Sequence, residues 1–567
     1  MISEDRVRHK FKVASAAVCA ISLAGLVTAC GSSTSPSANS TSGSSNTITM
    51  ESSPTGVLTR DFNPYLSSSE ASVLGTTDMI NEPLFQFDLE KPGVYYPWLA
   101  TSYAWSNSGK TITFTLRSGV KYTNGDPFNA ADVAFVFGLL KKFPTLNQSG
   151  LPIASTSAPN ATTAVINFST PEYAALYNIA NTPMVPEAVW SKISSPATYT
   201  DPTPVGTGPY VFDTFSTSGV LLKKNPNYWQ PGKPKVEYLD FPAYDSNTTA
   251  NLALENGSLT WGGNFVSDIK TAFLAKNPNY KVWDAPIHTE TIIPNLTKWP
   301  WTDLAVRQAV AVGIDRTAIS ADGEDGQQPP AIQPGSLTLL TLPTDTSYLT
   351  PQTSGAAYTT TYNTAEAKSI LKKAGFTLHS NGFFYLGSKE LAFTLTDPSS
   401  YTDFDDDNAI IASDLKAAGI NVTVQQVSVN AWNADIADGD FSATSHWGTA
   451  GTSPYYDYNG YLNSALTAPI GKTAVGDYER FDSKAADADL AAYVGTQSPT
   501  AQKAAIVALE KIVATQLPVI PMFYGVAWDE YNTTHFTGWP DASNQYATGE
   551  PNGPQNEYTV LQLTPKS

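Results

Sequence analysis

Residues 391–427 read LAFTLTDPSSYTDFDDDNAIIASDLKAAGINVTVQQV and decide the fold class. The runs 391–396 and 421–427 are rich in β-branched and apolar residues and predict two strands. Between them, 407–418 has helical periodicity, and Gly419 ends the helix because glycine readily adopts the left-handed backbone conformation. A helical crossover between two strands joins parallel neighbours in one sheet. The sequence therefore predicts an α/β fold.

Segments on both sides repeat this mixture of strands and helices. The stretch TITFTLR at 111–117 alternates apolar and polar residues after turn-forming residues at 105–110, which predicts a hairpin. Further helices are expected to begin after the caps Asn129, Asn363 and Ser498. The second should end at Gly375, and the third should continue to about residue 515 and lead into a strand at 518–524. Helices and strands thus alternate to the end of the chain.

Size and charge narrow the functional class. The chain has 567 residues, of which 41% are hydrophobic. A chain of this length contains more apolar residues than a single hydrophobic core normally holds. We therefore expect two or three domains. Lys and Arg number 33 against 51 Asp and Glu, a formal charge of −18. An acidic surface gives no electrostatic reason to bind phosphates, so nucleic acid is not an expected partner.

Cysteine and histidine are too sparse for metal or thiol chemistry. Cys19 and Cys30 are the two cysteines, both in the first 30 residues, so the body cannot contain a disulfide, a cysteine-ligated zinc or a thiol nucleophile. The five histidines are at positions 9, 288, 379, 446 and 535, and none forms an i, i+4 pair. We expect neither a metal site nor a cofactor.

The amino terminus has the pattern of an export signal. Four basic residues precede an uncharged run at 13–29, and Val27-Thr28-Ala29-Cys30 resembles the bacterial lipobox. Cys30 is then the lipidated mature N-terminus, followed by a serine-rich tether up to residue 46. The alternative is a retained membrane anchor with an incidental cysteine. The signal predicts a lipoprotein on the outer face of the bacterial cytoplasmic membrane.

Motifs for catalysis or phosphate binding are incomplete. Gly471-Lys472-Thr473 resembles the end of a phosphate loop, but Leu466 occupies the position of the required earlier glycine. No G-x-S-x-G elbow is present. The acidic run 403–407 lacks the glycine of a calcium loop and is better interpreted as a solvated helix N-terminus.

Aromatic side chains are abundant, with 12 Trp and 28 Tyr. Several lie beside Gly, Asn, Ser or Pro in expected loops, among them Trp261, Trp447, Tyr455 and Tyr456. An aromatic ring can stack on a ligand while its polar end fixes the orientation. The alternative is that these rings pack in the core.

A set of collinear motifs resembles family 5 of the extracytoplasmic solute-binding proteins, which serve ATP-driven importers of the oligopeptide, dipeptide and nickel class. The motifs cover nearly all of the body and lie at 81–88, 97–100, 113–121, 126–133, 204–210, 224–229, 303–309 and 314–316. Most are architectural: Gly206 and Gly208 should permit a tight backbone turn, and Arg307 should start a helix.

The resemblance implies two ligand-clasping lobes with a hinge and a third, smaller domain. The implied division is a signal peptide at 1–29, the lipidated Cys30 and tether to 46, lobe I at 47–80, 201–280 and 523–567, domain II at 81–200 and lobe III at 281–522. The candidate ligand-binding residues are Asn63, Trp261, Asn264, Trp447, Tyr455, Tyr456, Asp457 and Tyr524.

One departure from the family pattern bears on the ligand. In peptide-binding members, a Trp-x-x-Asp loop supplies the carboxylate for the peptide's α-ammonium, whereas this chain has Trp447-Gly448-Thr449-Ala450. The following 451–456 and 537–540 resemble the members that bind oligosaccharides. Asp457 is a possible replacement for the missing acid, so a short peptide and an oligosaccharide both stay open.

The resemblance implies a binding protein that is not an enzyme. It would capture a small solute by lobe closure and deliver it to the permease subunits of an ABC importer, as a monomer held to the membrane by its lipid. The competing classes are a cell-surface glycoside hydrolase that uses paired carboxylates and a surface receptor or adhesin that kept the fold without transport.

Overall fold

The computed structural model describes residues 46–51, 54, 56–91, 93–331, 333–337 and 360–566. The predicted signal, the lipidation site Cys30 and the tether up to residue 45 lie outside these residues. Residues 42–567 form one compact unit. In the described part of the chain, no helix combines the length and the hydropathy that a membrane crossing requires.

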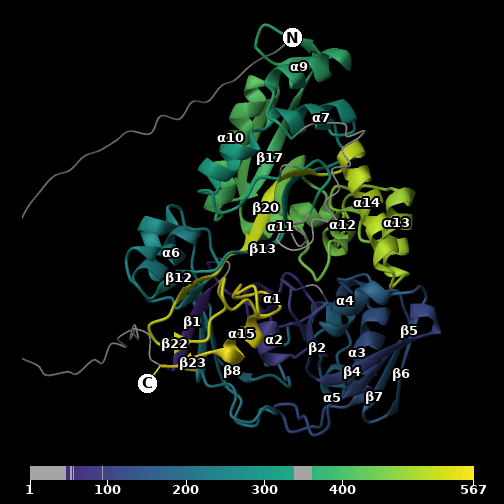
Figure 1. Ribbon diagram of the computed structural model, residues 1–567, viewed down its shortest axis with the longest axis vertical. Helices are drawn as coiled ribbons and strands as arrows, with labels where there is room; N and C mark the ends of the chain where they lie inside the picture. The colour runs from purple at the N-terminus through teal and green to yellow at the C-terminus, as the bar shows by residue number, and fades with distance from the viewer. Residues whose placement is uncertain are drawn as a thin grey trace, which may run out of the picture. The chain divides into compact units, whose positions relative to one another are not determined.

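A five-stranded sheet contains the segment that decided the fold class. Its strand order is β18 (Asn421–Val427), β17 (Ala392–Pro398), β19 (Ala443–Trp447), β13 (Ala285–Pro294) and β20 (Ile520–Ala527). β17 and β18 are parallel, with α10 (Thr402–Ala417) between them in sequence and packed on both (Figure 1). The predicted strand–helix–strand unit and the α/β class are confirmed. The helices α7 (Leu304–Gly313), α9 (Thr364–Lys373) and α11 (Val429–Asp438) pack around the same sheet.

The acidic run at the start of α10 differs from the prediction. The helix begins at Thr402 rather than at 407, and Asp403 and Asp407 are 8% and 0% exposed. The interpretation of the run as a solvated N-terminus is wrong for these two residues. They are four positions apart and therefore share one face of the helix, which is turned inward.

A seven-stranded sheet is assembled from distant parts of the chain. Its order is β12 (Tyr280–Val282), β21 (Glu530–Asn532), β11 (Trp261–Gly262), β1 (Thr47–Glu51), β10 (Tyr238–Pro242), β9 (Gly219–Lys224) and β8 (Tyr210–Ser216). Helices near it are α1 (Glu70–Val73), α2 (Thr76–Ile80), α6 (Asn247–Glu255) and α15 (Asn556–Gln562). The central strand β1 pairs in parallel with both β10 and β11.

A four-stranded antiparallel sheet forms a third core. Its order is β4 (Ala100–Ser106), β5 (Thr111–Leu116), β7 (Thr163–Phe168) and β6 (Ile153–Asn160), and α3 (Ala130–Lys142) packs on β6 and β7 (Figure 1). The predicted hairpin is β4–β5. Asn129 caps α3 as predicted, in a capping box with Asp132. The pair β2 (Phe85–Phe87) and β3 (Tyr95–Pro97) and the short helices α4 (Leu176–Ala180) and α5 (Glu187–Trp190) complete this region.

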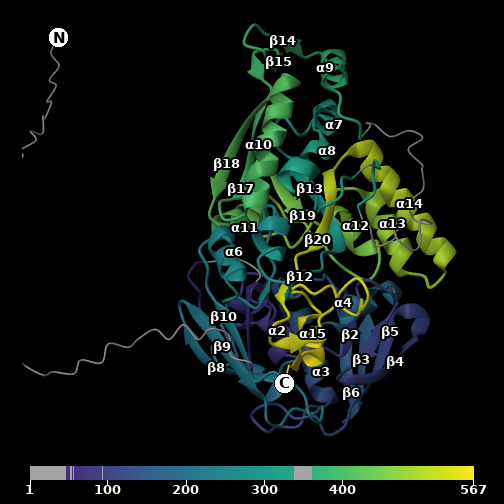
Figure 2. The ribbon, with the colours of Figure 1, turned by 60° about the vertical axis from the view of Figure 1, so that its left-hand side comes forward.

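Three helices follow the strand β19. They are α12 (Tyr455–Leu462), α13 (Lys484–Val494) and α14 (Pro499–Gln516), and α13 and α14 lie side by side (Figure 2). Ser498 caps α14 as predicted, and Asn363 caps α9. Tyr455 and Tyr456 begin α12, so the expectation that they lie in a loop is wrong. The remaining short elements are α8 (Arg316–Ala318), β14 (Thr377–Leu378), β15 (Phe384–Leu386), β16 (Lys389–Glu390), β22 (Phe536–Thr537) and β23 (Thr564–Pro565).

The glycines of the 204–210 motif allow two backbone segments to approach closely. A Cβ at Gly206 would lie 1.7 Å from the carbonyl oxygen of Ile80, and one at Gly208 would lie 2.3 Å from that of Met79. The Gly208 amide donates to the Ile80 carbonyl at 3.0 Å. Neither glycine has a positive φ, so the reason for glycine here is space at the end of α2 rather than a turn. The proposed domain boundaries stay a prediction.

Candidate functional site

Two neighbouring chain segments connect the seven-stranded and five-stranded sheets. β12 leads into β13 through Trp283 and Asp284, and β20 leads into β21 through Trp528 and Asp529. β13 and β20 pair antiparallel along most of their length, and the Trp283 amide donates to the Asp529 carbonyl at 3.0 Å. Residues on these two strands therefore lie at the junction of the two sheets.

A cavity of about 200 Å³ opens at this junction, and we call it the junction cavity. Residues near the seven-stranded sheet and residues of the five-stranded sheet and α10 share its wall, which places the cavity between the two sheets. The lining residues are Pro54, Asn247, Gly263, Asn264, Phe265, His288, Glu290, Tyr401, Asp403, Phe404, Trp447, Val526, Trp528, Glu550 and Asn552.

One side of the junction cavity is acidic. Glu290 on β13 and Asp403 on α10 are 6% and 8% exposed, and Glu550 lies in the wall. His288 Nε2 lies 3.0 Å from Glu290 Oε1. Burial raises the pKa of Asp403 to about 7, and the nearby charge of Glu290 raises it further. The buried position of Asp403 therefore disfavours its ionised form.

The aromatic part of the wall lies beside these carboxyl groups, because Trp447 pairs with Glu290 across β19 and β13. Tyr401, Phe404 and Trp447 lie at mutual centroid distances of 6.0 to 6.3 Å and all contribute to the wall. Trp432 is 1% exposed and packs behind Trp447 at 5.3 Å, with its Nε1 donating to Thr444 Oγ1 at 2.8 Å. The ring group is therefore supported from behind by a core tryptophan.

Trp447 also lines a second cavity, of about 210 Å³. Its wall includes Tyr456 on α12 and, from the region of the four-stranded sheet, Gln148 and Asn178. His446 stacks on Trp447 with ring centroids 4.7 Å apart. Burial lowers the pKa of His446 to about 4, so this ring is neutral at physiological pH.

The cavities include three of the eight candidate ligand-binding residues. Asn264 lines the junction cavity, Tyr456 lines the second cavity, and Trp447 lines both. The Tyr456 hydroxyl donates to the Ala174 carbonyl at 2.9 Å, so it also ties α12 to the region of the four-stranded sheet.

The other five candidates lie outside both linings and pack in the protein interior. Asn63 donates to the carbonyls of Pro196 and Tyr199, and Trp261 donates to Asp529 Oδ1 at 2.8 Å. Tyr455 stacks on Tyr493. Asp457 and Tyr524 are 1% and 2% exposed, and Asp457 points toward Gly448, where a Cβ would lie 2.2 Å from its Oδ1.

Several lining residues were not among the candidates. Glu290 and His288 lie two positions apart on β13, where no motif marks them, and the interpretation of the acidic run as a solvated helix end excludes Asp403 from the candidates. Tyr401 and Phe404 lie on either side of Asp403 in the sequence. This combination of aromatic and acidic residues at the start of a helix is the sequence signal that could have identified this part of the cavity wall.

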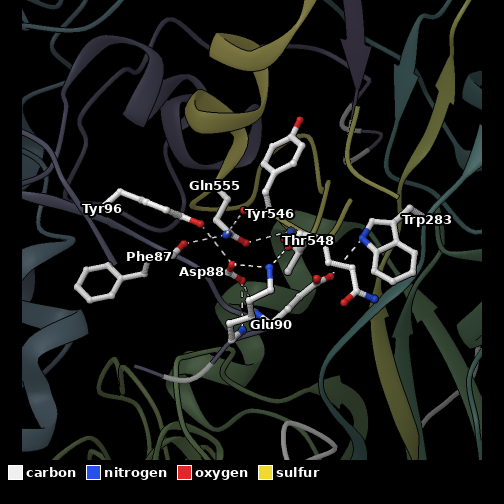
Figure 3. A network of polar contacts seen from close by, with 10 residues as sticks. Phe87, Asp88, Glu90, Tyr96, Trp283, Tyr546, Thr548 and Gln555 are labelled. Atoms are coloured by element: carbon white, nitrogen blue, oxygen red, sulfur yellow. Dashed lines mark hydrogen bonds and ion pairs between the residues drawn. The ribbon is translucent and has the colours of Figure 1, made fainter. Parts of the chain in front are cut away.

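A polar network links the junction to the region of β2 and β3 (Figure 3). Trp283 Nε1 donates to Glu90 Oε1 at 3.1 Å, and burial raises the pKa of Glu90 to about 7. Asp88 binds Lys91 at 3.1 Å. Gln555 Nε2 donates to the Phe87 carbonyl at 2.7 Å. The network thus joins three parts of the sequence beside the segment between β12 and β13.

A family comparison agrees with this architecture. The family described as bacterial extracellular solute-binding proteins, family 5, has a middle-region model that matches residues 94–468. The chain belongs to this family. The match confirms the family 5 resemblance seen in the sequence. Members of this family are substrate-binding components of ABC importers rather than enzymes.

Individual relatives differ in the ligand they are named for. The chain is 27% identical to a nickel-binding periplasmic protein of Escherichia coli, over 68% of this chain and 72% of that protein. It is 31% identical to the glutathione-binding protein GsiB of E. coli, over 52% of this chain and 56% of the relative.

Solved structures confirm the two-lobed fold of this family. A periplasmic oligopeptide-binding protein of Thermotoga maritima, bound to mannohexaose, superimposes with a TM-score of 0.83 at 25% identity, covering 92% of this chain and 99% of that one. The Bacillus subtilis oligopeptide-binding protein AppA, in complex with a nonapeptide, gives a TM-score of 0.76 at 19% identity, covering 92% and 99%.

Proposed function

We propose that this family 5 protein captures an oligosaccharide in the junction cavity and delivers it to the permease subunits of an ABC importer. The observation that carries the proposal is the wall of the junction cavity, which combines a cluster of aromatic rings with hydrogen-bonding amide and carboxyl side chains. Sugar rings stack on aromatic faces while their hydroxyls need neutral and acidic hydrogen-bond partners. The mannohexaose complex of the T. maritima relative supports the same ligand class.

A short peptide is the second candidate. The carboxyl groups of Glu290 and Asp403 favour it, because a peptide carries an α-ammonium and Ala450 offers no acid at the usual position. The nonapeptide complex of AppA has the same fold. In both cases the ligand would shift the protein toward a state in which both sides of the cavity contact it.

The anchor and the partners belong to the same proposal. Lipidation of Cys30 would hold the protein to the outer face of the cytoplasmic membrane, where it would act as a monomer beside the permease. Substituting Cys30→Ala should move the protein from the membrane fraction to the supernatant or leave the signal uncleaved. Full retention of the variant in the membrane, with the signal removed, would contradict the anchor.

Mass spectrometry of the solute that co-purifies with the mature protein tests the ligand class. An oligosaccharide or a peptide bound in a one-to-one ratio is the expected result, and calorimetric titration with mannohexaose, cellohexaose and tri- to pentapeptides then ranks the two classes. Incubation with the same oligosaccharides should give no cleavage products. If no member of either class binds, or if products appear, the proposed function is wrong.

A further inference from the structure

We propose that a basic surface beside the seven-stranded sheet contacts the anionic headgroups of the membrane to which the protein is anchored. We call the surface that carries Arg117, Lys233 and Lys235 the basic face. It shares no residue with the junction cavity or the second cavity. The inference therefore goes beyond ligand capture, and it uses the proposed anchor at Cys30 only to choose the partner.

Two stretches of sequence without acidic residues supply the basic face. Residues 91–125 contain Arg117, and residues 214–236 contain the two lysines. Neither stretch contains Asp or Glu, although Asp and Glu outnumber Lys and Arg by 51 to 33 in the whole chain. The structure brings the two stretches together at a surface pocket of about 450 Å³ that Arg117 and Lys233 both line. Positive charge is thus concentrated at one place on an otherwise acidic protein.

The cations of the basic face are held in place by neutral partners. The guanidinium carbon of Arg117 lies 4.4 Å from the centre of the Trp229 ring, and its Nε donates to the Trp98 carbonyl at 2.9 Å. Lys235 Nζ donates to Thr564 Oγ1 at 3.0 Å. Among the described residues, none of the three cations of the basic face has an ion-pair partner. These contacts orient the charges without cancelling them.

The two lysines also oppose each other's charge. Burial lowers the pKa of Lys233, and the positive charge of the nearby Lys235 lowers it further. In contrast, Lys223 on β9 is paired with Asp213 at 2.7 Å. An anion placed against the basic face would offset the repulsion between Lys233 and Lys235, as Asp213 does for Lys223.

The position of the basic face favours the membrane as the source of these anions. Asn46 is the first described residue, and its carbonyl accepts from the Glu237 amide at 2.9 Å. Lys235 is two residues before Glu237, and the chain from Lys233 to Glu237 spans at most about 14 Å. Asn46 lies 16 residues after Cys30, so an anchor at Cys30 keeps Asn46 within at most about 58 Å of the membrane. The anchor would thus hold the basic face near the headgroups.

Electrostatics would then orient the receptor on the membrane. An acidic protein is repelled by an anionic surface unless it turns a basic region toward that surface. Lys and Arg side chains are attracted to anionic headgroups, and the attraction is screened beyond about 8 Å at physiological salt. The C-terminus and β8 lie at the end of the molecule opposite α9 (Figures 1 and 2), and Lys235 contacts Thr564 close to that C-terminus. We therefore expect α9 to point away from the membrane.

Vesicle binding tests the proposal on the mature protein with Cys30→Ala, which has no acyl chain to insert. The vesicles consist of phosphatidylcholine alone or of phosphatidylcholine and phosphatidylglycerol in equal parts, and sedimentation gives the bound fraction. At low salt we expect the protein to bind the anionic vesicles about tenfold or more tighter than the neutral ones. The preference should disappear in about 0.5 M NaCl, because salt screens the attraction.

Two matched double variants locate the contact. Lys233→Gln/Lys235→Gln should weaken binding to the anionic vesicles about tenfold or more. Lys372→Gln/Lys373→Gln is the control, because it removes the same charge from exposed positions on α9 and should leave binding unchanged. Thermal melting checks that both variants fold.

The scarcity of cysteine allows a second measurement, of orientation. The mature Cys30→Ala protein contains no cysteine, so a fluorophore can be attached at a single introduced site. Ser118→Cys places an environment-sensitive fluorophore at the pocket of the basic face, and its emission should shift when anionic vesicles are added. Ser380→Cys places the same fluorophore at an exposed position between β14 and β15, and its emission should stay constant.

Several results would overturn the proposal. They are equal or absent binding to the two kinds of vesicle, equal loss of binding in the two double variants, and equal responses of the two fluorophores. Binding of the basic face to purified permease subunits but not to anionic vesicles would assign this surface to the importer and would also show the proposal to be wrong. Each of these results leaves ligand capture standing, because calorimetric titration of the junction cavity measures it separately.

Discussion

Substituting Trp447→Ala should weaken ligand binding at least about tenfold, or about 1.4 kcal/mol. Trp447 lines both cavities, so its ring is the one side chain among the candidates positioned to contact a ligand in either space. A stacked ring contributes on the order of 1 kcal/mol beyond the burial of its area. Covering roughly 40 Å² of the indole with ligand adds about 1 kcal/mol at 25 cal/mol per Å². The predicted loss is therefore a lower bound.

The assay is calorimetric titration with whichever of mannohexaose or trialanine binds the wild-type protein, together with thermal melting. Trp190→Ala is the control, because Trp190 is a buried tryptophan in the core beside the four-stranded sheet and does not line either cavity. Loss of this buried ring should cost about 3–5 kcal/mol of stability. An unchanged dissociation constant for Trp447→Ala, with a lowered melting temperature, would show that Trp447 only packs and would refute the reasoning.

Three further changes test the fold and its titration. Asn129→Ala removes the cap of α3 and should lower the unfolding free energy by about 1 kcal/mol in denaturant titration; no change would contradict the cap. Gly206→Ala places a Cβ 1.7 Å from the Ile80 carbonyl oxygen and should prevent soluble folding. The control is Gly138→Ala inside α3, where the nearest atom would lie 3.8 Å from the new Cβ, and it should be neutral or slightly stabilising. Equal yields of soluble protein from the two variants would contradict the clash. Burial raises the pKa of Asp78 from 3.8 to about 8, so the folded state holds this proton more tightly and stability falls as the pH rises from about 4 to about 8. Asp78→Asn should flatten that decline by up to a few kcal/mol in denaturant titrations at about pH 5 and about pH 8, and an unchanged decline would show that Asp78 is not its source.

Local signals predicted the regular elements well. The hairpin at 105–117, the capped start of α3 and the parallel pair around α10 depend on neighbouring residues, and the structure contains all three. The start of α10 was predicted less accurately. The helix begins at residue 402 rather than 407, because the acidic residues at 403–407 favoured an interpretation as a solvated helix end. Local patterns are sufficient where short-range contacts decide the structure.

The candidate site depended on contacts that a single sequence does not record. Trp261 and Trp447 have similar Gly-containing surroundings, yet one is fixed in the core by Asp529 and the other lines two cavities. Glu290 reaches the same wall as Asp403 through the pairing of β13 with β19 and the packing of α10. Which polar residues meet is decided by partners more than 100 residues away, so residue type alone could not identify them.

The seven-stranded sheet has a consequence for the order in which the protein can form. β21, which contains residues 530–532, lies between β11 and β12, and it bonds to both of them. During synthesis β12 therefore has no route into this sheet until nearly the whole chain has emerged. This late pairing makes folding slow, because the chain loses the entropy of closing a long loop before the contacts between the strands can stabilise it.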